Sequence, residues 1–362
     1  MEEDNEGFRY PITDKTFCND CGLCEQVCPV ITRYTIIEYE TKIFACKNKD
    51  ENVRRKSSSG GIFTILAEHI IQQNGIVFGA RFDHNFAVIH DFTETIEGLE
   101  DFRGSKYLQS LVLDNFTKAE YFLKQGRDVL FTGTPCQISG LKHFLRKEYN
   151  NLLAIDIVCH GVPSPKVFKN YLGELSLHNE GITEKIMFRD KTEGWKNYSF
   201  MTKRKDGKNT ITFRQIKDNN IYMRGFLQNL YLRPSCHACP SKELTSGSDL
   251  TLADYWGIEQ IHPDFDDDKG CSMVICNNIK GELIFKEIKS KVETIKTLAK
   301  YALQGNPCIV YSVTPHLNRD KFFNQIENKQ IGRIIKNLTK PTILELFVQA
   351  IYKFRYKIKI KL

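Results

Sequence analysis

The chain has 362 residues, of which 41% are hydrophobic, 26% charged and 11% aromatic, and this length suffices for about two globular domains. Because large apolar side chains are this frequent, the composition excludes disordered and fibrous proteins. The 51 lysines and arginines exceed the 44 aspartates and glutamates by a net charge of only +7, so we expect no nucleic-acid partner.

The sequence also indicates where the protein resides. No segment contains the roughly 18 uninterrupted apolar residues that a membrane-spanning helix requires. The acidic start MEEDNEGFRY differs from a signal peptide, which begins with basic and then apolar residues. We therefore expect a cytoplasmic protein, in which thiols stay reduced. Clusters among the 12 cysteines then indicate metal binding or redox chemistry rather than disulfide bonds.

The first part of the chain combines a cysteine-dense segment with strand and helix patterns. Residues 14–30 are polar and rich in cysteine, and residues 31–45 are typical of one or two small strands. The run IFTILAEHIIQQNG has apolar residues at helical spacing and ends at the turn signal Asn74-Gly75. The next residues, GIVFGARF, are typical of a strand.

The middle of the chain repeats a strand-turn-helix pattern. GRDVLFTG predicts a strand, TPCQ a tight turn and ISGLKHFLRKEY an amphipathic helix. The apolar run LLAIDIVC predicts a buried parallel strand beside the first one, and a helix follows over residues 168–175. Beyond residue 183, YSFMTKR and TITFRQI alternate as antiparallel strands do, with a turn at Asp206-Gly207. SMVICNN predicts one more core strand and GELIFKEIKS a helix.

Near the N-terminus four cysteines have the spacing of a bacterial ferredoxin loop, C-x2-C-x2-C-x3-C-P, which binds a 4Fe-4S cluster. They are Cys18, Cys21, Cys24 and Cys28, followed by Pro29. A zinc site needs only two cysteine pairs, and it requires neither the third close cysteine nor the proline. The run therefore predicts an iron-sulfur cluster.

The fourth ligand of this cluster is open. In two-cluster ferredoxins the last cysteine of such a run serves the other cluster, and this chain has one run. Cys28 could close the same cluster, serve a second one or pack. Cys46 is a candidate replacement, although a lone cysteine after an apolar stretch is more typical of a buried residue.

Four other cysteines could form a second site. Cys136 and Cys159 each follow a predicted strand, and the carboxyl ends of parallel strands meet at one edge of a sheet. Cys236 and Cys239 form a separate C-x2-C between prolines, which favour an irregular loop. We infer a second 4Fe-4S cluster on these four residues, with zinc binding as the open alternative.

Two further segments have the composition of anion-binding loops. Ser57, Ser58, Ser59, Gly60 and Gly61 precede a helix and offer backbone amides and hydroxyls to a pyrophosphate, although a simple helix cap is the alternative. Arg103, Gly104, Ser105, Lys106 and Tyr107 combine cations with an aromatic ring. Because iron-sulfur clusters pass single electrons, a two-electron organic cofactor is expected beside them, and a flavin fits that role best.

Six motifs together resemble the coenzyme F-420 hydrogenase/dehydrogenase beta-subunit family over residues 7 to about 320. The resemblance implies an iron-sulfur flavoprotein that binds FAD near the two anion-binding loops. It also implies a flavin-proximal role for Asp254, which lies in the segment ADYWG. Some relatives reduce coenzyme F-420, and many bacterial relatives are associated with polysaccharide biosynthesis. The motifs are SSSGGIFT, GSKYLQS, LFTGTPCQISGL, DIVCHGVPSP, RPSCHAC and SDLTLADYWG.

The sequence differs from the family at its start. Longer relatives have two ferredoxin-type runs, and the segment EGFRYP, which separates them, begins this chain. We expect one of three situations: a truncated start, a partner that supplies the missing half, or an incomplete N-terminal cluster site.

The expected fold is mixed α/β, with a small ferredoxin-like iron-sulfur module and a larger α/β flavin-binding domain that has an antiparallel appended part. The predicted domains are residues 1–45, the half-ferredoxin module; residues 46–320, the catalytic domain with FAD and a 4Fe-4S cluster; and residues 321–362, a C-terminal helix and basic tail. Residues 352–362 alternate apolar and cationic side chains. This pattern is typical of a frayed, solvated tail or of an edge strand, with a peripheral contact to the inner face of the membrane as the alternative.

The sequence therefore predicts an oxidoreductase with one or two 4Fe-4S clusters and FAD. It would pass electrons to or from a small organic or sugar-linked substrate, with a redox partner such as ferredoxin, and coenzyme F-420 is a candidate. One alternative is an electron-transfer subunit without its own substrate. The other is a zinc-containing, non-redox binding module.

Overall fold

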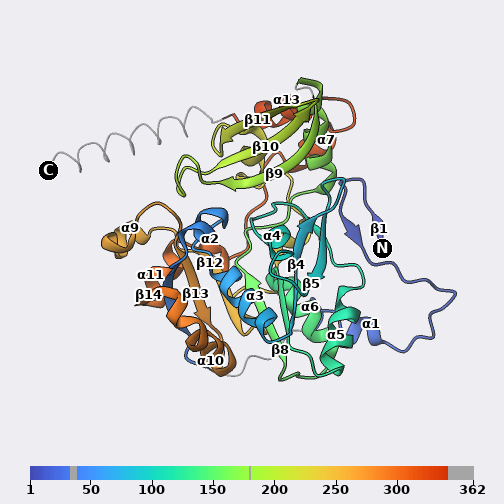
Figure 1. The fold of residues 1–362 in the computed structure, drawn as a ribbon. Coiled ribbons are helices and arrows are strands. Elements are labelled where there is room, and N and C mark those ends of the chain that lie inside the picture. Colours follow the sequence, from blue (N-terminus) through green and yellow to red (C-terminus); the bar gives the residue numbers. More distant parts are fainter. Residues whose placement is uncertain (33–38, 179–180, 341–362) are drawn as a thin grey trace.

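The computed structural model describes residues 1–32, 39–178 and 181–340. Within these ranges nine strands form one large mixed sheet, and three more form a small antiparallel sheet at one end of the molecule (Figure 1). The expected mixed α/β fold is confirmed. In spatial order the large sheet contains β14 (Val292–Thr297), β3 (Lys42–Asn48), β13 (Ser272–Cys276), β12 (Leu250–Asp254), β8 (Leu152–Ile157), β7 (Val129–Gly133), β4 (Ile76–Phe82), β5 (Val88–Thr93) and β6 (Ser110–Leu111).

The centre of the large sheet is parallel. Strands β4, β7, β8 and β12 run side by side in one direction. Strand β3 shares that direction, because β13 lies antiparallel between it and β12. The predicted parallel pairing of the two apolar runs, now β7 and β8, is confirmed. We call the edge where these five strands end the carboxyl edge of the sheet.

Helices cover both faces of the sheet, because side chains of a buried strand point alternately to each face. Leu130 of β7 packs with α3 (Ile62–Gln72) and α10 (Ile279–Ile288), whereas Phe131 packs with α5 (Asn115–Lys124) and α6 (Pro135–Leu145). The smaller helices surround this core. They are α2 (Glu51–Lys56), α4 (Leu99–Phe102), α9 (Ile258–Ile261) and α11 (Ala299–Gln304). Helix α12 (Arg319–Phe323) instead packs Phe322 against the aromatic residues beside the small sheet.

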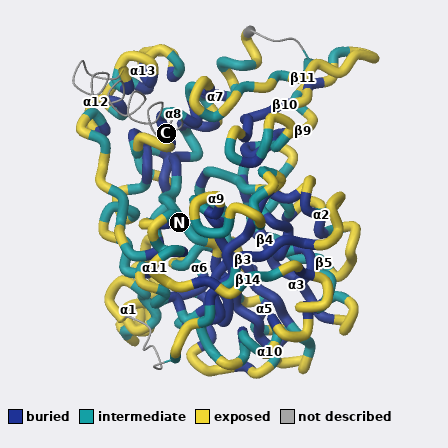
Figure 2. Tube along the Cα trace, turned by 90° about the vertical axis from the view of Figure 1, so that its left-hand side faces the viewer, coloured by how far each residue is buried: buried dark blue, intermediate teal, exposed yellow. Residues whose placement is uncertain are grey.

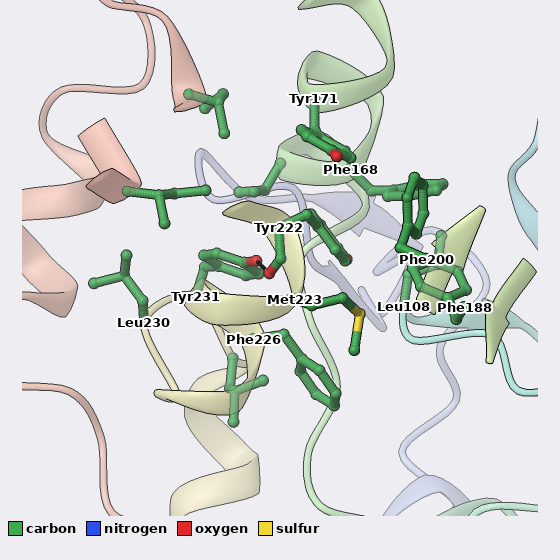
Figure 3. Packing of buried hydrophobic residues seen from close by; sticks show 14 of the residues in the cluster. Leu108, Phe168, Tyr171, Phe188, Phe200, Tyr222, Met223, Phe226, Leu230 and Tyr231 are labelled. Atoms are coloured by element: carbon green, nitrogen blue, oxygen red, sulfur yellow. Dashed lines mark hydrogen bonds between the residues drawn. The ribbon is translucent and has the colours of Figure 1, made fainter. Parts of the chain in front are cut away.

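The small sheet is closed by an aromatic cluster. It consists of β9 (Ile182–Asp190), β10 (Ser199–Asp206) and β11 (Asn209–Ile216), and Gly207 turns the β10–β11 hairpin with a φ of 57°. Helices α7 (Pro165–His178), α8 (Ile221–Leu227) and α13 (Ile331–Leu338) pack beside it. Figure 3 shows the rings that fill this space, where Tyr171 stacks on Tyr222 with centroids 5.4 Å apart. These rings fix α8 against the sheet.

The N-terminal segment is an arm attached to the body by few residues. Strands β1 (Glu2–Glu3) and β2 (Arg9–Tyr10) form a short hairpin, and α1 (Leu23–Gln26) lies in the cysteine run. Phe8 is fully buried, and the carboxylate of Glu6 pairs with Arg319. Figure 2 shows buried residues concentrated along the large sheet, whereas the segment around α1 is mostly exposed. The predicted domain division stays a prediction, and β3 crosses its boundary after residue 45.

One predicted turn is wrong, and the predicted C-terminal tail cannot be compared with the structure. The segment TPCQ is not a separate turn, because α6 begins at Pro135 with Thr134 and Gln137 forming a capping box. The predicted basic tail lies outside the described residues. None of the helices within the described ranges combines the length and hydrophobicity of a membrane-spanning segment.

The packing of α10 generates a prediction. A methyl group on Gly281 would collide with the carbonyl oxygen of Asp249. We therefore expect Gly281→Ala to lower the free energy of unfolding by about 1–3 kcal/mol, as overpacking does. Gly173 of α7 has no neighbouring atom within 4 Å of its added methyl group, so Gly173→Ala is the matched control and should stabilise by about 0.5–1 kcal/mol. Urea denaturation measures both, and a Gly281→Ala protein as stable as the control would contradict the packing.

Candidate functional site

A cavity of about 630 Å3 opens at the carboxyl edge of the large sheet. Ends of β7, β8 and β12, the first turn of α3 and residues of α8 contribute to its walls. This volume is within the range of small-molecule and cofactor sites. Ten of the eleven residues that the sequence predicts to bind the flavin line it: Ser57, Ser58, Ser59, Gly61, Arg103, Gly104, Ser105, Lys106, Tyr107 and Asp254.

The remaining predicted residue, Gly60, lies in the same loop but not on the cavity wall. A methyl group on it would collide with the carbonyl oxygen of Cys46 and lie 2.7 Å from the backbone nitrogen of Ser272. Its backbone N–H donates to the Ser272 hydroxyl at 2.9 Å. Gly60 thus allows the loop to approach β3 and β13 closely.

The loop of residues 57–61 is held over the start of α3. Gly61 precedes the helix with a φ of 82° and, as a glycine, has no side chain with which to cap the first turn. The amide donors of that turn are therefore available to an anion in the cavity. The Ser58 hydroxyl accepts from the backbone N–H of Ser105 at 2.7 Å, so the two loops predicted from sequence contact each other.

The second loop contains two cations, and among the described residues only Arg103 forms an ion pair with a carboxylate. Arg103 donates to Glu100 at 2.7 Å and to the hydroxyl of Thr64 at 3.2 Å. The ammonium group of Lys106 donates to the carbonyl oxygens of Asp101 and Arg103. Burial lowers the pKa of Lys106 to about 7. Because its hydrogen-bond acceptors are neutral, the Lys106 cation would gain from a bound anion.

The aromatic residue of this loop is already packed. The ring of Tyr107 stacks on Phe226 with centroids 4.7 Å apart, and its backbone carbonyl accepts from the Tyr222 hydroxyl. The Tyr107 hydroxyl accepts from Arg189 at 3.2 Å. The ring therefore connects the cavity to the aromatic cluster of Figure 3.

Asp254 forms a buried ion pair that sequence reasoning missed. The guanidinium of Arg189, at the end of β9, donates to both carboxylate oxygens of Asp254, at 2.8 and 3.1 Å. The Arg189 and Asp254 side chains are only 3% and 17% exposed. Trp195 also donates to Asp254 at 2.9 Å and stacks on Trp256 with an interplanar angle of 4°. Since β9 belongs to the small sheet, this pair fastens that sheet to the cavity.

The four cysteines predicted to form the second site converge beside this cavity. Gly133 of β7 pairs with Asp156 of β8, and Cys136 and Cys159 each follow three residues later. Cys136 lies in the first turn of α6, and Cys159 in the loop after β8, on the cavity wall.

The other two cysteines come from a long-range loop. Cys236 lies in the short 3-10 helix η1 (Pro234–Ala238), and Cys239 follows its end. The backbone N–H of Cys239 donates to the Ser312 hydroxyl at 3.0 Å. The backbone N–H of Val162, in the loop after Cys159, donates to the Cys236 sulfur at 3.4 Å. This contact brings the loop to the carboxyl edge.

All four thiols influence one another. Burial raises the pKa of Cys159 well above its ordinary value, and Cys136, Cys236 and Cys239 raise it further. Burial likewise raises the pKa of Cys236 to about 11, and Cys136 and Cys239 contribute. Burial also raises the pKa of Cys136, and Cys239 adds to this effect. Every pair in the group thus interacts, and neighbouring positive charge would be needed to ionise the thiols together.

The N-terminal cysteines are arranged differently. Cys18, Cys21 and Cys24 are exposed and Cys28 is half-buried. Cys46 is fully buried in β3, where burial raises the pKa of its thiol well above the ordinary value and Cys271 and Cys276 add to the effect. These surroundings are those of a core cysteine. Among the residues the structure describes, no three His, Cys, Asp or Glu side chains form a ready-made site for a single metal ion.

The buried ion pair gives a prediction about stability. Arg189→Met leaves the carboxylate of Asp254 in the interior without its cation, so we expect a loss of about 3–5 kcal/mol in the free energy of unfolding. The double variant Arg189→Met/Asp254→Asn should lose less than the sum of the single variants, because no uncompensated charge remains. Chemical denaturation of the wild-type protein, the two single variants and the double variant measures the coupling free energy between Arg189 and Asp254. Additive losses would contradict a direct interaction.

A histidine in the cavity wall gives a prediction about pH. His90 is 2% exposed, donates from Nε2 to the Thr132 carbonyl at 3.1 Å, and contacts the Ser110 hydroxyl through Nδ1. Burial lowers the pKa of His90 from 6.5 to about 4. Between these values the unfolded chain binds a proton that the folded protein does not, so stability falls as the pH falls through this window.

The loss amounts to about 3 kcal/mol over the whole window. His90→Gln removes the titrating group, and we expect its free energy of unfolding to depend less on pH between about pH 7 and about pH 4. Denaturant titrations across this range compare the variant with the wild-type protein. Parallel pH profiles would show that the imidazole of His90 does not carry the effect.

Part of the chain is similar to a known protein family. Residues 126–300 match the family model that describes the C terminus of the coenzyme F420 hydrogenase/dehydrogenase beta subunit. No curated protein matches the chain.

Among solved structures, the chain is similar to one from the F420-reducing [NiFe] hydrogenase complex of Methanosarcina barkeri, described after xenon derivatization. The two share 16% sequence identity with a TM-score of 0.48, over 84% of this chain and 92% of that one. The matched region of the family model includes β7, β8, β12 and all four converging cysteines. The predicted resemblance to the coenzyme F-420 hydrogenase/dehydrogenase beta-subunit family is therefore confirmed over residues 126–300, which are similar to the C-terminal part of that subunit.

Proposed function

We propose that this chain is an iron-sulfur flavoprotein oxidoreductase. It would pass electrons between 4Fe-4S clusters and FAD to reduce or oxidise a small organic or sugar-linked substrate. The observation that carries the proposal is the meeting of two predicted groups at one edge of the sheet. Cys159 belongs to the converging cysteines and also lines the cavity that contains Lys106 and Ser58.

The converging cysteines fit an iron-sulfur cluster. Cys136, Cys159, Cys236 and Cys239 supply an all-sulfur donor set from three separate loops, as 4Fe-4S clusters require. In a cubane each thiolate binds a different iron, so the sulfurs lie further apart than ligands of one ion. The mutual proximity of the four thiols supports a shared group held by all of them.

The cavity fits a flavin dinucleotide. Free amides at the start of α3 and the ammonium group of Lys106 would hold the pyrophosphate. The Arg189–Asp254 pair and the stacked tryptophans form a rigid, largely buried wall that excludes water. When bound, FAD supplies the exchange between two-electron and one-electron chemistry. The residues of the chain bind, orient and shield this group.

The exposed N-terminal cysteines support an exchange of electrons with another protein. Cys18, Cys21 and Cys24 lie at the surface beside the exposed ring of Phe17. A second cluster on this run would be accessible to a redox partner such as ferredoxin. In this proposal the two domains have different roles. Residues 1–45 would receive or deliver electrons, and residues 46–320 would hold FAD and the cluster on the four converging cysteines.

The proposal predicts how iron content responds to substitution. Cys136→Ala or Cys239→Ala should remove the iron of one cluster while the iron of the N-terminal run remains, because a cluster with three thiolates is labile. Cys308→Ala is the matched control, since this thiol lines the same cavity but lies outside the group of four. Iron and flavin assays on anaerobically purified protein measure the outcome.

We expect a brown wild-type protein that releases flavin on denaturation. Unchanged iron in both Cys136→Ala and Cys239→Ala would remove these residues as ligands. Colourless protein that contains zinc would reject the proposed function. Protein that holds both cofactors but oxidises organic donors only when a partner protein is added would identify an electron-transfer subunit.

A further inference from the structure

Two cations flank the four converging cysteines. The ammonium group of Lys242 donates to the carbonyl oxygens of Cys159, at 2.9 Å, and Cys308, at 2.7 Å. Arg233 immediately precedes η1, and its backbone carbonyl accepts from the backbone N–H of Cys236 at 2.9 Å. The backbone N–H of Arg233 donates to the carbonyl oxygen of Val162 at 2.8 Å, which holds Arg233 beside the loop after Cys159.

Neither cation is neutralised by a carboxylate among the described residues, where their hydrogen-bond acceptors are neutral carbonyls. Arg233 donates to the backbone carbonyl of Arg9 at 3.1 Å, and its guanidinium lies 4.4 Å from the centroid of the Tyr10 ring. Its Nε is buried without a hydrogen-bond partner. Both residues are half-buried, where a charge is less favourable without a compensating group nearby, so the arrangement favours an anionic occupant between them.

Hydrogen bonds to sulfur act in the same direction as these charges. Val162 donates its backbone N–H to the Cys236 sulfur at 3.4 Å. Net charge and hydrogen bonds to sulfur are among the factors that set the potential of an iron-sulfur cluster. By contrast, the Cys18 sulfur in the N-terminal run lies 3.5 Å from a carboxylate oxygen of Asp20. The cationic environment is therefore a feature of the four converging cysteines and not of the N-terminal run.

We propose that Arg233 and Lys242 are positioning residues that raise the reduction potential of the cluster held by Cys136, Cys159, Cys236 and Cys239. This inference rests on the proposed function. The four thiolates outweigh the positive charge of the iron-sulfur core, and reduction adds one more negative charge. A nearby cation stabilises the reduced state more than the oxidised state, because the Coulomb attraction grows with the charge of the cluster.

The test is a potentiometric titration of the full-length protein with its clusters, in which electron paramagnetic resonance monitors the reduced cluster. Lys242→Met and Arg233→Met each remove one cation, and we expect the ratio of reduced to oxidised cluster at a fixed potential to fall about tenfold. For a one-electron couple this corresponds to a midpoint about 59 mV lower. Lys242→Arg and Arg233→Lys keep the charge and should restore most of the wild-type midpoint, which a purely structural role does not require.

Lys208→Met controls for the loss of one positive charge, because Lys208 is exposed in the β10–β11 turn. Its midpoint should equal that of the wild-type protein. Iron content is measured for every variant, and if one methionine variant loses its iron, the other variant carries the test. Wild-type midpoints in iron-replete Lys242→Met and Arg233→Met would overturn this inference alone. A wild-type protein that binds no iron would overturn the proposed function, and the inference with it.

Discussion

The parallel pairing of β7, β8 and β12 is the constraint on which the candidate site depends. Because these strands run in the same direction, their ends lie on one edge of the sheet. Cys136 and Cys159 each follow three residues after the paired residues Gly133 and Asp156, so both lie at this edge. β3 ends on this edge too, so the loop of residues 57–61 reaches the cavity that β12 closes with Asp254. Residues far apart in the sequence thereby share one site.

Charge is distributed over this edge in three distinct ways. Arg189 and Asp254 compensate each other inside the wall, which makes them part of the scaffold. Lys106 faces the cavity with neutral acceptors, in keeping with a site for an anionic group. Arg233 and Lys242 lie beside the thiols, also with neutral acceptors. The paired charges thus position the site, whereas the remaining cations are available to the groups we propose to bind there.

Sequence patterns predicted the parts of this arrangement that depend on local signals. Apolar runs identified β7 and β8, and the rule that parallel strands end together placed Cys136 beside Cys159. The start of α6 was missed although its signal, a capping box from Thr134 to Gln137, is local. Arg189 could not be found this way, because it reaches Asp254 only after the small sheet folds back over the cavity. Gly60 shared the composition of an anion-binding loop, but its role is close backbone packing against β3.

We propose that the four cysteines at the carboxyl edge hold iron beside a flavin. Anomalous X-ray scattering at the iron absorption edge, from crystals of anaerobically purified protein, locates that metal directly. We expect a strong iron peak enclosed by the sulfurs of Cys136, Cys159, Cys236 and Cys239, with flavin density in the adjoining cavity. A peak at the zinc edge in this position, or iron found only at the N-terminal run, would contradict it.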